Sequence, residues 1–407
     1  MKDIYDLIII GGGAAGMMTA ITAGRRGRSV LVVEGQDVPG KKLSATGNGR
    51  CNITHDPISH GAYHTDHKKR LQSVLSQFSF EDTRRFFEGI GVSVYNRDGY
   101  VYPRSNEALS VVKCLSLAME EAGVDVLLGC RVVSAKKTDG SFVLSAESKD
   151  GLTELFGNKL VIACGGMAGT EVGGCDFGIE LAKSFNHRIS EPFPALTDLV
   201  CEGLSFKKIK GVRTQGKVEI IMDDEVISSS VGELQFTGKG ISGIPIFNVS
   251  FEAISALKIK KDIYARIDLF PELTMDMLFA YLTYRFSIGR RSAEEAFLGF
   301  LPEKLIPELL KLLELNGKKA GRIEETKRRE LCQILKGLPL RVTGHGDYSH
   351  SQVMAGGVLL HDLKDTLESD SVEGLYFAGE IINADGICGG YNLQWAWSCG
   401  AVVGNAV

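Results

Sequence analysis

Apolar residues at the start of the chain mark one continuous structural unit. The apolar run IYDLIII covers residues 4–10, the glycine loop GGGAAG follows at 11–16, a stretch with helical spacing comes next, and the run SVLVVE ends on Glu34. This order of strand, glycine turn, helix, strand and acid is much more specific than a glycine motif alone. It predicts a dinucleotide-binding βαβ unit.

Each glycine of this motif has its own physical role. Gly11 permits the tight turn out of the strand, Gly13 lets the backbone approach a pyrophosphate, and Gly16 lets the helix pack closely on the sheet. The phosphates are expected at the helix N-terminus, whose unpaired N–H groups favour an anion. Glu34 ends the second strand, where a carboxylate can accept both ribose hydroxyls. The alternative is a Rossmann turn without a ligand.

The segment PGKKLSATGNGRCNITH at residues 39–55 is too rich in glycine and polar residues for a core element. It comes directly after the ribose-binding acid. This position favours a loop that runs along an extended cofactor and offers backbone N–H groups, Lys42 and Arg50 to its phosphates. A long surface connection is the alternative interpretation.

Helical and β patterns alternate as far as residue 166. Apolar positions at helical spacing within 66–89, and again from Ser105, predict amphipathic helices. The run VDVLLGCRVVSAKK and the alternating pair SFVLSAES and LTELFGNKLVIACGG predict a strand followed by a hairpin. The last strand ends at Cys164 and Gly165, where two-dinucleotide flavoproteins return the chain to the cofactor. Cys164 is expected to pack and not to react.

Two inserted domains are expected next. Short alternating runs such as KVEIIM and EVISSS, joined at Asp223 and Asp224, predict a mainly β domain over 192–268. Apolar residues three and four apart then predict a small helical domain over 269–336. The sequence GKGISG at 238–243 also matches the glycine motif, but no acid-terminated strand follows it. We therefore expect no second, nicotinamide-binding βαβ unit.

The C-terminal segment returns to a strand and a glycine-rich turn. The strand stops at Gly379 and Glu380, and a helix begins near Tyr391. An NAD site is usually completed within one Rossmann unit, whereas FAD lies extended and needs a distant acid for its ribityl chain, a role that suits Glu380. The helix N-terminus at Gly390 could stabilise negative charge at the pyrimidine edge of a flavin. Both features favour FAD over NAD.

The chain therefore predicts an α/β fold, a split Rossmann-like FAD-binding domain of the two-dinucleotide-binding flavoprotein type, with an inserted mainly β domain and a small helical domain. The first part of the FAD-binding domain is expected at 1–191 and the β and helical domains at 192–268 and 269–336. Residues 337–407 are expected to return through the β domain and to complete the FAD-binding domain.

Composition agrees with a cytoplasmic enzyme. The 407 residues are 44% hydrophobic and 24% charged, which is ordinary for a globular protein. A formal charge of -4 gives no electrostatic reason to expect nucleic acid or a membrane as partner, so a small-molecule substrate is expected. The N-terminal apolar run continues into the glycine turn and predicts a strand, not a signal peptide. Nine cysteines without a CxxC pair favour reduced thiols.

Three longer segments carry a family resemblance: EGQDVPGKKLSATGNGRCNIT, FTGKGISG and SVEGLYFAGEIINADGICGGYNLQWAWSCG. Together they resemble bacterial FAD-dependent oxidoreductases, the aminoacetone-oxidase-like proteins and bile-acid dehydro-reductases, over nearly the whole chain. The resemblance adds a backbone contact to adenine near Val133. The chain departs from the family pattern at 236–238 and 169–178, both outside the dinucleotide motif.

The motifs and the resemblance together give one set of expected cofactor-binding residues. They are Gly11, Gly13, Ala14, Ala15, Gly16, Glu34, Lys42, Arg50, Cys51, Asn52, Val133, Gly165, Glu380, Gly390, Tyr391, Asn392 and Leu393.

The chemistry expected of such a protein is hydride transfer through flavin N5. The preferred hypothesis is a reductase of a polarised double bond, such as an enone, fed by transiently bound NAD(P)H. A flavin oxidase of a small amine and a non-catalytic electron carrier are the alternatives.

No catalytic residue is assigned from the sequence. The candidates near the flavin end are Tyr391, Cys388 and Cys51, and the candidates for a lid or the substrate side are His345, Tyr348 and His350. The histidines at 60, 64 and 67 lack an accompanying cysteine or carboxylate pattern, so no metal site is expected.

Overall fold

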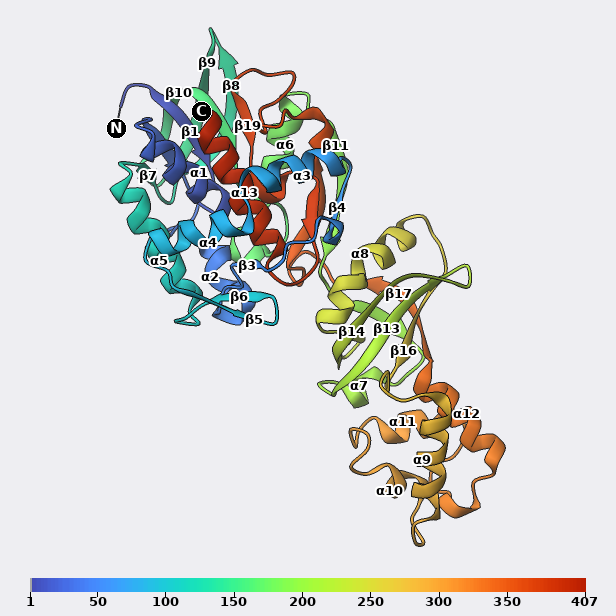
Figure 1. The fold of residues 1–407 in the computed structure, drawn as a ribbon. Coiled ribbons are helices and arrows are strands. Elements are labelled where there is room, and N and C mark those ends of the chain that lie inside the picture. The colour runs from blue at the N-terminus through green and yellow to red at the C-terminus, as the bar shows by residue number, and fades with distance from the viewer. Residues whose placement is uncertain (1) are drawn as a thin grey trace. The chain divides into compact units, whose positions relative to one another are not determined.

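The computed structural model describes residues 2–407, which divide into two compact units. Unit 1 consists of the residues up to Pro194 together with Gln352–Val407, and unit 2 is the inserted segment Ala195–Ser351 (Figure 1). The first and last parts of the chain therefore build one unit. The finer division of the insert into a β and a helical domain stays a prediction.

Unit 1 is built on a seven-stranded sheet with the order β7-β2-β1-β10-β9-β8, in which β19 also pairs with β10. The strands β1, β2, β7, β10 and β19 run parallel, while β9 and the first half of β10 form the predicted hairpin and β8 pairs with the other edge of β9. Their bounds are β1 Tyr5–Ile10, β2 Val30–Val33, β7 Asp125–Leu127, β8 Arg131–Thr138, β9 Ser141–Ser148, β10 Gly151–Ile162 and β19 Leu375–Phe377. The parallel strands β1 and β2 are almost wholly buried, which explains their unbroken apolar runs.

The helices of unit 1 surround this sheet (Figure 1). They are α1 Ala14–Arg25, α2 Lys41–Ala45, α3 Lys68–Gln77, α4 Phe80–Gly89, α5 Ala108–Glu121, α6 Phe177–Ser184 and α13 Tyr391–Ala406, with single 3₁₀ turns η1 Thr46–Gly49, η2 His60–Ala62, η3 Thr170–Val172, η5 Leu360–Asp362 and η6 Gly379–Ile381. A capping box at Ser79 and Asp82 starts α4 and separates it from α3. The 39–55 segment was predicted to be a loop, but it contains α2 and η1.

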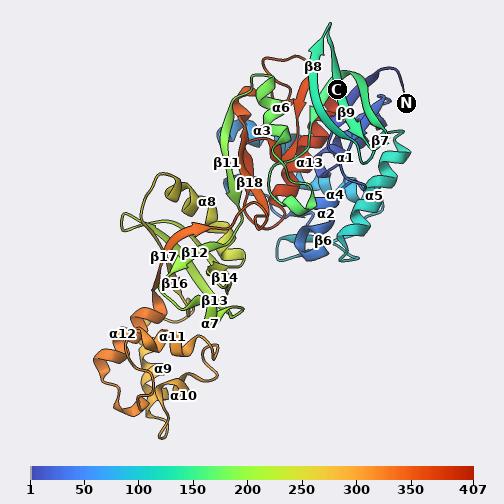
Figure 2. The ribbon, with the colours of Figure 1, turned by 180° about the vertical axis from the view of Figure 1, so that it is seen from behind.

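The shorter strands of unit 1 lie outside the main sheet. They are β3 Thr54–His55, β4 Tyr63–Thr65, β5 Val94–Arg97, β6 Tyr100–Pro103, β11 Ile189–Ala195, β18 Val353–Val358 and β20 Ala384–Gly386. The strands β11 and β18 pair with each other, so the chain leaves unit 1 and re-enters it through two neighbouring strands (Figure 2).

The first and last helices of unit 1 pack closely and run in the same direction. A Cβ atom at Gly400 would lie 2.6 Å from the Ala15 carbonyl oxygen, and one at Gly404 would lie 2.5 Å from Thr22 Cβ. Both glycines are therefore needed for the approach of α13 to α1. Trp395 and Trp397 are buried on α13, and their indole N–H groups donate to the carbonyls of Gly379 and Ile53.

Unit 2 begins with a closed six-stranded barrel of the order β12-β15-β14-β13-β16-β17. Its strands are β12 Leu199–Glu202, β13 Arg213–Met222, β14 Glu225–Phe236, β15 Gly240–Ser242, β16 Ile263–Asp268 and β17 Leu338–His345. Asp223 and Asp224 form the predicted turn between β13 and β14, with φ of 51° and 65°. The GKGISG segment contains β15, an antiparallel strand of this barrel and not part of a parallel βαβ unit.

Helices complete unit 2. They are α7 Phe206–Ile209, α8 Ile244–Lys258, α9 Met275–Ser287, α10 Ala293–Phe297, α11 Ile306–Lys311 and α12 Glu325–Lys336, with the 3₁₀ turn η4 Ala320–Arg322. Helix α8 lies in the stretch that was predicted to be mainly β. The sequence did contain a signal for this helix. It consisted of a proline in the first turn, Pro245, and apolar residues at helical spacing, Ile246, Val249, Ala253 and Ile254, which are buried.

Candidate functional site

The glycine loop between β1 and α1 has the geometry of an anion-binding turn. Gly11 has φ of 103°, and a Cβ atom at Gly16 would lie only 1.9 Å from the Gly11 carbonyl oxygen. A Cβ atom at Gly13 would meet no protein atom within 4 Å. Gly11 and Gly16 are therefore required by the protein itself, whereas the space beside Gly13 is left open.

Helix α1 begins without a side-chain cap. Its N-cap residue is Gly13, and its first turn contains no acid. The first-turn N–H groups of Ala14, Ala15 and Gly16 have no intrahelical acceptor because they precede the first complete turn. They form a concentration of donors at the positive end of the helix dipole.

The carboxylate of Glu34 lies directly beside this loop. Its Oε2 accepts a 2.7 Å hydrogen bond from the Gly12 N–H, and its Oε1 accepts one of 2.8 Å from the Gln36 N–H. These bonds hold the acid at the end of β2, where the sequence placed it.

Residues from three distant parts of the chain meet at Glu380. Lys42 Nζ donates to Glu380 Oε2 at 2.7 Å, and the Met354 N–H donates to Glu380 Oε1 at 2.9 Å. Gly165, with φ of 72°, lies close by, since a Cβ atom there would be 3.9 Å from Glu380 Oε2. The predicted contacts Lys42, Gly165 and Glu380 are thus brought together.

The residues that follow η1 differ strongly in burial. Arg50 is exposed, Cys51 is fully buried with φ of 61°, and Asn52 is half-buried. The Asn52 Oδ1 atom is buried without a hydrogen-bond partner among the described residues. Such an atom is costly unless a ligand or water satisfies it.

The turn that precedes α13 is held by several hydrogen bonds. The Asn392 side chain accepts from the Gly386 N–H at 2.8 Å and donates to the Gly386 carbonyl at 2.7 Å. His55 Nδ1 lies 3.0 Å from the Gly389 carbonyl oxygen, and the His55 ring stacks on Tyr391 with a centroid separation of 4.9 Å. The helix then starts at Gly390 with no side-chain cap and no acid in its first turn.

Asn392 and His55 have different roles in this turn. The side chain of Asn392, predicted as a cofactor contact, is engaged by the turn, so only its backbone N–H can face a ligand. His55 was not selected from the sequence, because its partner Gly389 is 334 residues away. Leu393 lies one residue further along the helix and is half-buried.

Val133 lies on β8, at the register irregularity between Val132 and Ser134. Its side chain is 44% exposed. At this irregularity the backbone of β8 is not paired residue for residue with β9.

The cysteine candidates are poor nucleophiles. Burial raises the pKa of the Cys51, Cys164 and Cys388 thiols to about 12. Only the thiolate reacts readily. These three residues are therefore protonated and inert near neutral pH, in agreement with the packing role expected of Cys164.

The remaining candidates belong to other parts of the chain. His345, Tyr348 and His350 belong to unit 2, where His350 Nδ1 lies 2.8 Å from Asp347 Oδ1. His64 pairs with Asp385 at 3.0 Å, and His67 accepts from the Arg70 N–H as the cap of α3. Within residues 2–407, no three His, Cys, Asp or Glu side chains are arranged to hold a metal ion.

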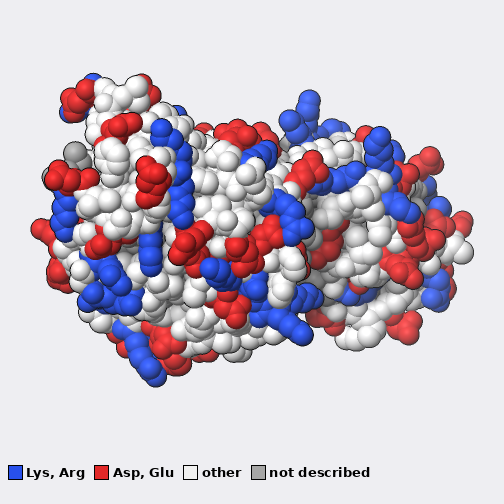
Figure 3. All heavy atoms as spheres, turned by 90° about the horizontal axis from the view of Figure 1, so that it is seen from above, with Lys and Arg blue, Asp and Glu red and all other residues white. Residues whose placement is uncertain are grey.

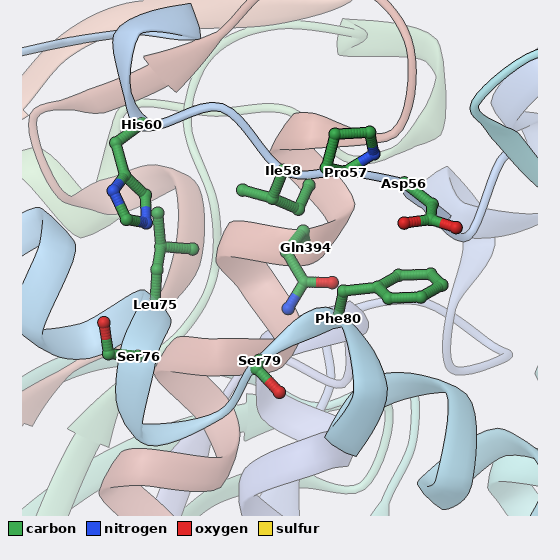
Figure 4. Close-up of a pocket in the computed structure, with 9 residues that line it drawn as sticks. All are labelled: Asp56, Pro57, Ile58, His60, Leu75, Ser76, Ser79, Phe80 and Gln394. Atoms are coloured by element: carbon green, nitrogen blue, oxygen red, sulfur yellow. The ribbon is translucent and has the colours of Figure 1, made fainter.

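A separate pocket of about 250 Å³ lies behind the start of α13. It was not predicted from the sequence. Figure 4 shows Gln394 at its centre, between the 56–60 loop and the start of α4. The lining residues are Asp56, Pro57, Ile58, His60, Leu75, Ser76, Ser79, Phe80 and Gln394. Gln394 already accepts from Thr54 Oγ1 and donates to the Phe78 carbonyl, so it is fixed by the protein.

The family comparison matches nearly the whole chain. The model of the HI0933-like protein Rossmann domain matches residues 5–406. The chain belongs to this family. A 3-dehydro-bile acid delta(4,6)-reductase from Clostridium scindens is 36% identical over 98% of this chain and 98% of that protein. A ribosomal RNA dihydrouridine synthase from Escherichia coli is 28% identical over 97% of this chain and 96% of that protein.

Among solved structures, a 3-ketosteroid delta1-dehydrogenase from Sterolibacterium denitrificans has a TM-score of 0.54 and 13% identity, and it covers 100% of this chain and 99% of that chain. This likeness concerns the fold. The predicted fold class and family are confirmed, and this member of the HI0933-like family is an oxidoreductase enzyme. No helix within residues 2–407 is long and apolar enough to cross a membrane.

Proposed function

We propose that FAD lies extended between the N-termini of α1 and α13. The parallel packing of these helices supports this most directly, because Gly400 of α13 lies beside Ala15 at the start of α1. The first residue of α13, Tyr391, is nine residues earlier, so α13 extends about 14 Å beyond the start of α1 at 1.5 Å per residue. The positive N-terminus of α1 suits a pyrophosphate, and that of α13 suits a flavin. Glu380 is held close to the start of α1.

The residues at these positions fit the cofactor. The open space at Gly13 admits a pyrophosphate, and the partnerless Asn52 Oδ1 offers a buried acceptor. In this proposal Glu34 accepts from the adenosine ribose, the backbone near Val133 contacts adenine, Lys42 and Arg50 supply positive charge, and Glu380 holds the ribityl chain. The other contacts are Gly11, Ala14, Ala15, Gly16, Cys51, Gly165, Gly390, Tyr391, Asn392 and Leu393.

Bound FAD would supply hydride transfer at flavin N5. The role of the protein is to orient the cofactor and to stabilise charge. The unpaired N–H groups at the start of α13 favour negative charge beside them, and the bonds from Asn392 and His55 fix those N–H groups in place. The inert thiols of Cys51 and Cys388 leave Tyr391 as the remaining candidate of this group. Its hydroxyl stays protonated near neutral pH because burial raises its pKa above the ordinary value, so it is a candidate proton donor and not a base.

We infer that the reaction is reduction of a carbon–carbon double bond polarised by a carbonyl group, with NAD(P)H as the transient electron donor. The reductase name of the 36% identical relative supports this class. A hydride adds to the carbon remote from the carbonyl, and a proton adds to the carbon beside it.

An anaerobic titration of the purified yellow protein with NADPH and then NADH tests the donor. The proposal expects prompt loss of the oxidised flavin absorbance and its recovery on addition of an enone. Recovery only with oxygen, accompanied by peroxide, would instead indicate an oxidase. No bleaching with either nucleotide would overturn the proposed donor.

A base within RNA is the second candidate substrate. The 28% identical relative is named as a ribosomal RNA dihydrouridine synthase. Uracil contains a double bond conjugated with a carbonyl, so the same chemistry applies. Incubation of the reduced protein with RNA transcripts, followed by mass spectrometry of the nucleosides, tests it. Dihydrouridine formation would support this substrate, and its absence under conditions that reduce an enone would exclude the tested RNA.

A further inference from the structure

The small sheet β3-β6-β5 of unit 1 collects aromatic side chains on one face. His55 is paired with Tyr100, and their ring centroids lie 5.2 Å apart. Tyr102 is paired with Tyr95, and their ring centroids lie 6.0 Å apart. Directly paired residues point to the same face of a sheet, and so do residues two apart along a strand, such as Tyr100 and Tyr102. We call these four side chains the aromatic face.

The aromatic face meets the turn before α13 at Tyr100. A Cβ atom at Gly389 would lie 3.1 Å from Tyr100 Cε1, so the tyrosine ring packs directly on this glycine. The neighbouring His55 ring is bonded to the Gly389 carbonyl and stacks on Tyr391. Tyr100 therefore lies against the turn that leads into the N-terminus of α13, which is where the proposed function places the flavin.

The hydroxyl of Tyr100 is available to a ligand. Within residues 2–407 it has no hydrogen-bond partner, whereas the Tyr95 hydroxyl donates to Asn106 Oδ1 at 2.7 Å. The Tyr100 side chain is half-buried, so a partner for its hydroxyl is worth more there than in open water. Burial raises the pKa of Tyr100 above its ordinary value, and the nearby Cys388 thiol adds to this effect. The hydroxyl is therefore protonated near neutral pH and acts as a donor.

The proposed reaction needs a donor of this kind at the carbonyl group of the substrate. When a hydride adds to the carbon remote from the carbonyl, the electron pair of the double bond moves toward the carbonyl, and negative charge collects on its oxygen. A fixed O–H donor stabilises this charge more strongly than it stabilises the neutral carbonyl, which lowers the barrier. A proton then adds to the carbon beside the carbonyl. This step restores the C=O bond and leaves the donor hydroxyl unchanged.

We propose that Tyr100 is a catalytic residue whose hydroxyl donates a hydrogen bond to the carbonyl oxygen of the substrate. The inference rests on the proposed reductase function and adds the group that polarises the double bond. It also restricts the substrate class, because a hydroxyl donor favours a double bond conjugated with an acceptor oxygen over an isolated alkene.

The test uses the FAD-loaded variant Tyr100→Phe, which keeps the ring and removes only the hydroxyl. Its flavin is reduced with stoichiometric dithionite, so the result does not depend on the nucleotide donor. Reoxidation by 2-cyclohexen-1-one should be slowed roughly 100-fold, in the limiting rate more than in the concentration for half-saturation. Reoxidation by ferricyanide, which contains no carbonyl, should be unchanged. The matched control is Tyr102→Phe, which removes a hydroxyl from the same face and should keep both rates within about twofold.

Flavin content and circular dichroism show whether each variant is folded. A titration with cyclohexanone, followed by the flavin absorbance, measures ketone binding without turnover, and Tyr100→Phe should weaken it by less than about tenfold. Equal losses of rate with the enone and with ferricyanide would overturn the proposal, because the flavin site itself would then be damaged. An unchanged enone rate in Tyr100→Phe would overturn the role of Tyr100 alone. Failure of the enone to reoxidise the unmodified protein would overturn the proposed reduction together with it.

Discussion

At the scale of single residues, the three motif glycines separate into two kinds. Gly11 and Gly16 are fixed by contacts within the protein, and the space beside Gly13 is open. These roles could be predicted from the sequence because they depend on local turn chemistry. The Lys42–Glu380 pair could not, because it joins residues 338 positions apart.

The difference between Gly13 and Gly16 gives a first prediction. Gly13→Val should fold normally, because φ at this position is -79° and no protein atom obstructs a side chain, but it should lose most bound FAD. Gly16→Ala should be destabilised by about 3 kcal/mol or more, because its Cβ would overlap the Gly11 carbonyl. Urea unfolding and flavin absorbance of both variants distinguish the effects. A Gly13→Val protein that retains full FAD would contradict the proposed site.

His187 provides a prediction about pH. Its ring is buried, Nε2 lies 2.9 Å from Ser369 Oγ, and burial lowers its pKa below the ordinary 6.5. The unfolded chain therefore takes up a proton at a higher pH than the folded chain does, and stability is lost as the pH falls below about 6.5. The free energy of unfolding should therefore fall as the pH is lowered through this range. His187→Asn should remove this part of the pH dependence, and an unchanged pH profile would refute the assignment.

At the scale of elements, the turn before α13 shows what tertiary structure adds to sequence analysis. The helix start at Tyr391 was predictable from the glycines that precede it. The use of the Asn392 side chain within the turn was not, because a polar residue at a helix start suits a cap, a turn or a ligand equally well. Helix α8 was missed for a different reason: its signal was present, but the surrounding β pattern dominated the interpretation.

The turn supports a second prediction about the cofactor. Asn392→Ala removes both hydrogen bonds to Gly386 and should weaken FAD binding roughly tenfold, because the first N–H groups of α13 are no longer held in position. Asn316→Ala, which removes one hydrogen bond in unit 2, serves as the control and should bind FAD normally. Dissociation constants measured by flavin fluorescence test both. Equal affinity in the two variants would show that the turn does not support the site.

At the scale of the whole molecule, all of the proposed FAD contacts belong to unit 1. The net charge of the chain was a poor guide to its surface. Figure 3 shows basic and acidic side chains interspersed over one face, and a total of -4 says nothing about where unpaired cations gather.

The paired strands β11 and β18 lead to the last prediction. Replacement of residues 195–351 by a short Gly-Ser linker should leave a yellow protein that retains FAD, since the two ends of unit 1 already lie side by side. The absorbance spectrum of the purified protein provides the measurement, and a folded but colourless product would contradict the assignment of the cofactor to unit 1.

The packing of α13 on α1 also has a consequence for biosynthesis. The glycine loop is translated long before Gly400 and Gly404. The cofactor site is therefore complete only after α13 has left the ribosome. On this basis FAD is retained only once α13 has been made, and chains that terminate before α13 emerge without a site that could retain it.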